Sequence, residues 1–397
     1  MTRIRLRLLL LALLPLVVLL PVFLGFTMMR WIDKFDELLI SKVVSDLRVA
    51  EQYFEQIEAG QASDIAALAQ SVRFQDARRR GPDVFQSFLT AEQTRLDLDF
   101  LTFKNDAGVD LPDAARAVVA EAEPDAPSAA LAIFTADELA QISPALLERA
   151  ALPLVPTEAA RAISRETETR GMIILAAHRA PDGQSVLLGG RLLNRNLDVI
   201  DTMNDLIYRE SVDGQERRGT TTLFLDDVRI STNVRLFEGE RALGTRVSEV
   251  VWTQVMKNGQ PWFDRAFVVN DWYISGYVPL TDAEGSRIGM LYTGFLEAPF
   301  IGQRNTTILS LIVAFVAVIC ISVPIFLRLA RGVFAPLEKM TETMARAETG
   351  ALEARIGPVA ARDEIGTVAR HLDRLLDQVQ ERDEALRGYA DNLNELV

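Results

Sequence analysis

The sequence predicts an α+β protein with two transmembrane helices. Two apolar runs, Leu8 to Met29 and Thr306 to Leu327, each contain 22 residues and no charged residue. As helices they are long enough to cross a hydrocarbon core of about 30 Å. The 276 residues between them mix helical periodicity with short alternating strands, and the 70 residues after them are charged and helical in pattern. We therefore expect one soluble region outside the membrane and a helical segment inside.

Arginines indicate the orientation of the two spans. Arg3, Arg5 and Arg7 precede the first run, and Arg328 and Arg331 follow the second. Positive residues near the ends of spans stay on the cytoplasmic side, so we expect residues 1–7 and both termini in the cytoplasm, spans at 8–29 and 306–327, and residues 30–305 outside. A cleaved signal peptide is the alternative for the first run, but its apolar core is normally about 7–15 residues before a small-residue cleavage site. This run is longer and leads into Thr27-Met28-Met29-Arg30-Trp31, which favours an uncleaved anchor.

Composition excludes several classes of function. The formal net charge of −13 disfavours nucleic acid as a partner. Cys320 is the only cysteine and lies in the second apolar run, so no disulfide can form within the chain. His178 and His371 are the only histidines, and the chain has no phosphate-binding loop, no GxSxG and no HExxH motif. We expect no catalytic residue, no metal site and no cofactor within these 397 residues.

The first half of the external region predicts a helix followed by a sheet. Residues 31–74 carry apolar residues at three- and four-residue steps, and Gly81-Pro82 is expected to end this helical region. Alternating residues from Leu96 to Asp110 lead into Asn-Asp-Ala-Gly, which predicts a hairpin. A loop over 120–130 and further helical sequence come next. Two strands, 171–177 and 185–193, then follow, joined by Pro181-Asp182-Gly183.

The same order then recurs in the second half. A helix over 196–209 precedes strands at 221–225 and 228–232, which flank Asp226-Asp227. A short helix is predicted over 248–257, with Ser248 as its N-cap. Three strands follow at 262–269, 272–280 and 288–296. Hairpin, helix and antiparallel meander thus occur twice, which is the order of a PAS-like sheet with a helical cover and a pocket between them.

Four segments carry a family resemblance: TLFLDDVRISTNVR, GERALGTRVSEVVW, DRAFVVNDWYISGY and PLTDAEGSRIGMLYTG. Together they resemble the membrane-proximal module of double Cache domains, which are extracellular sensors of bacterial receptors. We expect a stalk helix and membrane-distal module over 30–193 and the proximal module over 194–305. The resemblance implies that the protein lies in the bacterial inner membrane, with a periplasmic sensor that binds a small molecule without chemistry.

Arginines and tyrosines are the candidate ligand-binding residues of the proximal module. A guanidinium offers a two-pronged donor that suits a carboxylate, which makes a carboxylate-bearing small molecule the favoured ligand. Strand alternation places Tyr273 and Tyr277 on one face and Trp272 on the other. The alternative is that these aromatic residues are core and the arginines structural, with the site in the distal module at Arg170, Arg179 and Arg191. The candidate ligand-binding residues are Arg235, Arg246, Arg265, Tyr273 and Tyr277.

The cytoplasmic segment contains two heptad seams separated by glycines. The first seam is Val333, Leu337, Met340, Met344, Ala347 and Ala351, and the second is Ile365, Val368, Leu372, Leu375 and Val379. Ala335-Pro336-Leu337 and Asp363-Glu364-Ile365-Gly366 resemble the two markers of a HAMP domain over 330–381. A generic coiled coil explains neither marker. The candidate signal-conversion residues are Pro336, Leu337, Met340, Met344, Glu364, Ile365, Gly366 and Leu372.

The HAMP resemblance implies a parallel four-helix bundle made by two chains, and hence a homodimer. Residues 382–397 resemble the coiled coil that leads into histidine kinases, although His371 lacks a His-Glu-x-x-x-Pro context. We expect the receptor half of a sensor histidine kinase, with a response regulator as partner only if a kinase module follows. The alternatives are a chemoreceptor, the receptor half of a diguanylate cyclase and a stand-alone membrane sensor. The sequence that follows residue 397 would separate them.

Overall fold

The structure is a computed structural model that describes residues 14, 18–105, 111–124, 126–180, 184–208, 219–236, 239–357 and 363–395. Its mixture of helices and antiparallel sheets confirms the α+β class. The chain forms two compact units, one of residues 33–302 and one that combines residues 1–32 with 303–397.

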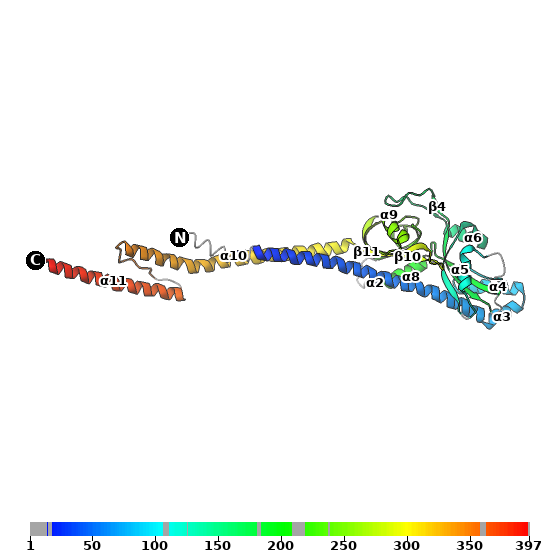
Figure 1. The fold of residues 1–397 in the computed structure, drawn as a ribbon, viewed down its shortest axis with the longest axis horizontal. Coiled ribbons are helices and arrows are strands. Elements are labelled where there is room, and N and C mark those ends of the chain that lie inside the picture. Colours follow the sequence, from blue (N-terminus) through cyan, green and yellow to red (C-terminus); the bar gives the residue numbers. More distant parts are fainter. Residues whose placement is uncertain are drawn as a thin grey trace. The chain divides into compact units, whose positions relative to one another are not determined.

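A long helix, α2, organises the first unit. It spans Leu20–Gln70, and its buried positions recur at three- and four-residue intervals from Leu39 to Phe54 and again from Ala62 to Leu68. Leu39 and Val43 pack on the sheet of the proximal module, while Ile65 and Leu68 pack on the sheet of the distal module. Figure 1 shows α2 running beneath both sheets of this unit. The helix predicted from residue 31 onward is therefore confirmed.

Two short helices follow α2. Helix α3, Val72–Arg79, starts where the Ser71 hydroxyl accepts a hydrogen bond from the Phe74 amide at 3.1 Å. Helix α4 spans Pro82–Arg95. The prediction that Gly81-Pro82 ends the helical region was wrong. Gly81, with a φ of 112°, turns the chain, and Pro82 opens the next helix, where its missing amide hydrogen costs nothing.

The distal sheet has four antiparallel strands in the order β1-β6-β5-β2. These strands are β1 Phe100–Asn105, β2 Ser128–Phe134, β5 Gly171–Arg179 and β6 Ser185–Leu192. One face packs against α2, α3 and α4. The other is covered by α5 Asp113–Glu121, α6 Ala136–Ile142 and α7 Pro144–Ala150. A small ladder of β3 Leu152–Pro153 and β4 Thr167–Glu168 follows.

Two expectations for this module were wrong. The predicted hairpin is absent from the described residues, because β1 pairs with β6 and the chain enters α5 soon after β1. The predicted turn itself, at residues 106–108, lies outside the described residues, as does the joint at 181–183. The loop predicted over 120–130 runs into strand β2, which is made by the apolar run SAALAIF. The predicted strands at 171–177 and 185–193 are confirmed.

The proximal sheet has five antiparallel strands in the order β8-β7-β11-β10-β9. These are β7 Gly219–Leu225, β8 Val228–Thr232, β9 Trp262–Val268, β10 Asp271–Thr281 and β11 Arg287–Leu296. Helices α2 and α8 (Leu197–Ile207) cover one face. Helix α9 (Glu249–Trp252) and the π-helical turn η2 (Thr253–Lys257) cover the other. The PAS-like order predicted for this half is confirmed, although Ser248 precedes α9 without a side-chain capping bond.

The second unit is helical. Helix α10 spans Ala298–Glu348 and contains Pro324 and Pro336 without interruption. Helix α11 spans Glu364–Glu395. Within the described residues, α10 is the one helix long and apolar enough to cross a membrane. The first apolar run lies partly outside these residues, so its span stays a prediction.

Candidate functional site

Three tyrosines gather on the proximal face that α9 and η2 cover. Tyr273 and Tyr277 on β10 are 7% and 2% exposed, and Tyr292 on β11 is fully buried. The ring centroids of Tyr277 and Tyr292 lie 4.7 Å apart. Trp272 is half exposed and packs its edge against Phe267. Strand alternation therefore separates Tyr273 and Tyr277 from Trp272, as the sequence predicted.

Arg229 lies among these tyrosines. Its neighbours on β8, Val228 and Ile230, belong to the core on the opposite face, so alternation turns Arg229 toward α9 and η2. It is 4% exposed, donates to the Thr245 hydroxyl at 2.5 Å and stands 5.0 Å from the Phe224 ring centroid. Sequence reasoning missed this residue, although the Val-Arg-Ile alternation could have identified it.

The environment of Arg229 is unusual for a buried cation. Among the described residues no carboxylate pairs with it, and its Nε atom has no hydrogen-bond partner. Burial lowers the pKa of its guanidinium. Burial likewise raises the pKa of Tyr273 to about 12 and raises that of Tyr277. The tyrosines are therefore hydroxyl donors at neutral pH, and the site combines an unpaired cation with neutral donors.

The cover over this cluster contains an irregular turn. The amide of Asn258 bonds to the Thr253 carbonyl at 3.0 Å, which is the five-residue spacing of a π-helix. Val255 and Met256 of this turn pack in the same core as the tyrosines. Single π-helical turns are frequent at functional sites. We therefore expect α9 and η2 to move if a ligand enters.

The candidate arginines Arg246 and Arg265 are engaged in ion pairs. Arg246 donates through two nitrogens to Asp227, which is fully buried and also receives Arg161 and Arg165 at 3.3 Å each. Arg265 pairs with Glu297, which immediately follows β11, and with Asp36 on α2 at 3.0 Å. Neither is directed into the tyrosine cluster, and both hold parts of the first unit together.

Arg235 and Tyr273 instead line a common groove of about 310 Å³ on the proximal module. Arg235 is exposed and donates to the Gly239 carbonyl at 2.7 Å. The other arginine of the groove, Arg241, is paired through two hydrogen bonds with Asp201. Tyr273 therefore borders both the groove and the surroundings of Arg229.

The alternative arginines of the distal module also contact protein groups. Arg170 forms two hydrogen bonds to Glu168 at 2.9 Å each. Arg179 donates to the carbonyls of Val119 and Ala122 at the end of α5. Arg191 donates to the carbonyls of Leu96 and Asp97. Arg170 thus pairs with a buried carboxylate, and Arg179 and Arg191 satisfy carbonyls at helix ends, as expected for structural arginines.

The candidate signal-conversion residues lie where α10, the segment 349–357 that follows it (the connector) and α11 meet. Met340 packs with Ile356 of the connector and with Ala369 and Leu372 of α11. The Asp373 carboxylate accepts the amides of Ile356 and Gly357 at 2.8 and 3.3 Å, which fixes the connector on α11. Glu364 is the first residue of α11, Ile365 follows it, and the Gly366 amide bonds to Asp363 at 3.1 Å. Pro336 lies within α10.

Much of the predicted seam is left open within one chain. Leu337, Met344, Val368 and Leu375 are each more than two-fifths exposed. The inward face of α11 is offset by one residue from the predicted seam and buries Gly366, Ala369 and Leu376. A single chain thus covers one side of each helix and leaves an apolar stripe on another.

Comparison with known families supports two assignments. Residues 191–307 match the family model of single Cache domain 3, and residues 328–381 match that of the HAMP domain. The chain therefore carries a Cache module and a HAMP domain, connected by α10. The Cache model covers the proximal sheet, and the distal sheet precedes the matched residues. No curated protein matches the chain.

Several solved structures are similar to this chain at low identity and low TM-score. The periplasmic domain of Vibrio cholerae LuxQ is 12% identical, covers 64% of this chain and 98% of its own, and gives a TM-score of 0.36. The ligand-binding domain of the Pseudomonas aeruginosa PAO1 amino acid chemoreceptor PctB, in complex with L-Gln, is 15% identical. It covers 68% of this chain and 90% of its own, with a TM-score of 0.29. Methyl-accepting chemotaxis protein X is 12% identical and covers 62% of this chain and 96% of its own, with a TM-score of 0.27.

Proposed function

We propose that this protein is a bacterial inner-membrane receptor that senses a small molecule outside the cytoplasm and signals through α10 to its HAMP domain. The order of its parts supports this, because the Cache module, the apolar helix and the HAMP domain follow one another along the chain. The arginines beside both apolar runs support two spans with both termini in the cytoplasm.

The proposed ligand is a small carboxylate bound by Arg229, Tyr273 and Tyr277. The observation that carries this proposal is a buried guanidinium that has no carboxylate partner among the residues the structure describes. Removing such a charge from water costs several kcal/mol unless a counter-charge compensates for it. A ligand carboxylate would supply that charge and accept the unused Nε–H, and the protonated tyrosines would donate to it. The groove between Arg235 and Tyr273 is the proposed entrance.

Thermal unfolding of the full chain in lipid nanodiscs tests this proposal. Acetate, pyruvate and succinate are compared with acetamide, which has the shape of acetate but no charge. We expect at least one carboxylate to raise the unfolding temperature, since ligand at 100 times its dissociation constant stabilises by about 2.7 kcal/mol. Arg229→Met should abolish this rise. Arg195→Met is the matched control, because the Arg195 side chain is exposed and donates to the Ala151 carbonyl.

Two outcomes would contradict the proposed ligand site. One is an equal response to acetamide, which would remove the role of the charge. The other is a carboxylate response that survives Arg229→Met, which would place binding elsewhere in the protein.

The proposed output is a histidine kinase that acts as a homodimer on a response regulator. The continuation of α11 to Glu395, well beyond the HAMP match, supports a signalling coiled coil. The protein, expressed with everything its gene encodes, should form an acid-labile phosphohistidine from labelled ATP. Receptor methylation or a cyclic dinucleotide product would instead favour the chemoreceptor or the diguanylate cyclase.

A further inference from the structure

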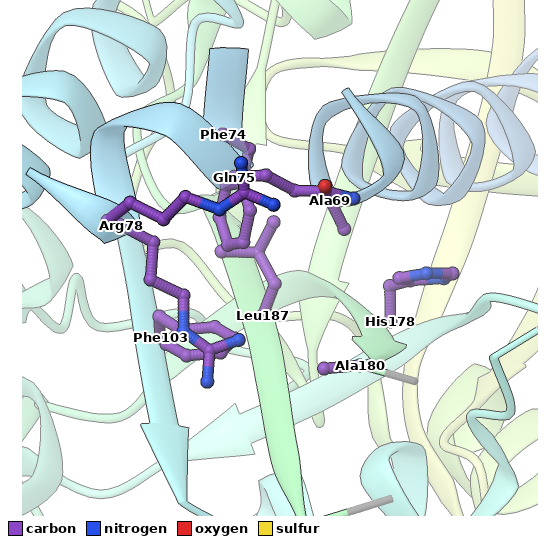
Figure 2. A pocket seen from close by; sticks show the side chains of 9 residues that line it. Ala69, Phe74, Gln75, Arg78, Phe103, His178, Ala180 and Leu187 are labelled. Carbon is purple, nitrogen blue, oxygen red and sulfur yellow. The ribbon is translucent and has the colours of Figure 1, made fainter. Parts of the chain in front are cut away.

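A second cavity lies in the distal module, far along the chain from the tyrosine cluster. It has a volume of about 480 Å³, within the range of about 300–1,000 Å³ typical of small-molecule pockets. Its walls come from the end of α2, from α3 and from the distal sheet. In the view of Figure 2, Arg78 lies over Phe103 and His178 stands at the other end of the cavity.

The polar groups of this cavity are cationic or neutral. Arg78 and Arg79 come from the last turn of α3, Gln75 lies one turn earlier, and the buried His178 comes from β5. None of the described lining residues is acidic. Arg79 pairs with Asp76 at 3.8 Å, and both side chains are at least half exposed, so this pair contributes little.

The helix dipole alone does not explain this arrangement. Cations at the C-terminal end of a helix are favoured by its partial negative charge, which accounts for the arginines of the last turn. The dipole does not explain why Arg78 and Arg79 both border a partly apolar cavity that also has the His178 imidazole in its wall. Arg80 provides the comparison, because it continues the same basic run but does not line the cavity.

The remaining wall is apolar. Leu187 is buried at the base, and Phe103 presents a ring whose face is 4.9 Å from the Arg78 guanidinium carbon. An inorganic anion would leave this surface uncovered. A ligand with one anionic group and an apolar body would satisfy both halves of the cavity, with the anion at the arginines and the body against Leu187 and Phe103.

We propose that this distal cavity binds a small organic anion with an apolar body, of the size and chemistry of benzoate. It is a second site, independent of the carboxylate site proposed around Arg229. Arg78 and Arg79 bind the anionic group, and Gln75 or His178 supplies a further hydrogen bond.

Calorimetric titration of the full chain in nanodiscs with benzoate tests the proposal, with benzylamine as a cationic analogue of the same shape. Wild type should bind benzoate at millimolar concentration or below and should not bind benzylamine. Arg78→Gln and Arg79→Gln should each weaken binding by about tenfold or more, the effect of losing one charge-assisted bond. Arg80→Gln removes the same charge outside the cavity and should change affinity less than about twofold.

Two further variants test whether benzoate binds within this cavity and not at the tyrosine cluster. Ala69→Phe fills the cavity without changing charge and should abolish benzoate binding while the unfolding temperature is kept. Arg229→Met should leave benzoate affinity unchanged. The proposal is overturned if benzoate does not bind, if benzylamine binds equally well, if Arg80→Gln weakens binding as much as Arg79→Gln, or if binding is lost in Arg229→Met.

Discussion

Replacing Arg229 should separate its role in binding from any role in folding. The guanidinium is buried, with one hydrogen bond to Thr245 and one aromatic neighbour at 5.0 Å. The hydrogen bond contributes about 1.5–3 kcal/mol and the aromatic contact up to about 2 kcal/mol. Their sum is similar to the several kcal/mol that burial of an ion costs. Methionine has a similar length and no charge. We therefore expect Arg229→Met to leave the stability of the ligand-free protein unchanged or to raise it by about 1–3 kcal/mol.

Asp227→Asn supplies the contrasting case within the same module. Asp227 is fully buried and bound by Arg246, Arg161 and Arg165. Removal of its charge breaks the buried pair with Arg246, while Arg161 keeps Asp226 and Arg165 keeps Glu168. The expected loss is about 3–5 kcal/mol. At roughly 2–4 °C per kcal/mol, differential scanning fluorimetry of the full chain should show a clear fall for Asp227→Asn and none for Arg229→Met. A fall of similar size in both variants would refute the reasoning, because it would make Arg229 a structural residue.

Three further predictions address pH dependence, assembly and orientation. Burial, together with the nearby Glu55, raises the pKa of Glu58 from 4.5 to about 7. Because the folded state holds this proton more tightly than the unfolded state, the stabilising contribution of Glu58 is complete below about pH 4.5 and is lost as the pH rises through about 7. The unfolding temperature should therefore decline less across this pH range in Glu58→Gln than in the wild type. In a Cys320→Ser background, single cysteines at Leu375 or Val368, both more than half exposed on the predicted seam, should crosslink between chains more rapidly than a cysteine at Glu342, and equal rates would argue against a packed dimer. A reporter active only outside the cytoplasm should respond when fused in the β10–β11 turn at Glu284 but not at Glu384, and the reverse pattern would invert the proposed topology.

Elements with strong periodicity were predictable from the sequence. The proximal strands follow the alternation of residues 221–296. Successive hairpins account for the pairing of β7 with β8 and of β9, β10 and β11 in turn, but not for the pairing of β7 with β11. The distal module was harder, because β1 finds its partner in β6, about 85 residues later, and local pattern carries no information about so distant a pairing. Strand β2 was missed because its alanine-rich sequence has low strand propensity and depends on packing against β5.

The candidate site was predictable only in part, and for a similar reason. Alternation correctly assigned Tyr273 and Tyr277 to one face. Sequence could not distinguish Arg246 and Arg265, which have carboxylate partners, from Arg229, which has none in the described part of the chain. The partners Asp227, Glu297 and Asp36 are brought near by the fold. Which arginine is uncompensated is therefore a property of the tertiary structure.

The junction between β11 and α10 has a consequence for how sensors of this kind can be recombined. A single residue, Glu297, separates the strand from the helix; its amide bonds to the Trp272 carbonyl at 3.0 Å, and its carboxylate pairs with Arg265. Without a loop to absorb an insertion, one added residue within α10 turns every later side chain by about 100° around the helix axis. The sensor module thus sets the direction in which each side chain of α10 points around the helix axis. A functional chimera would have to join its two parent proteins at matching positions of the helical turn rather than at matching lengths.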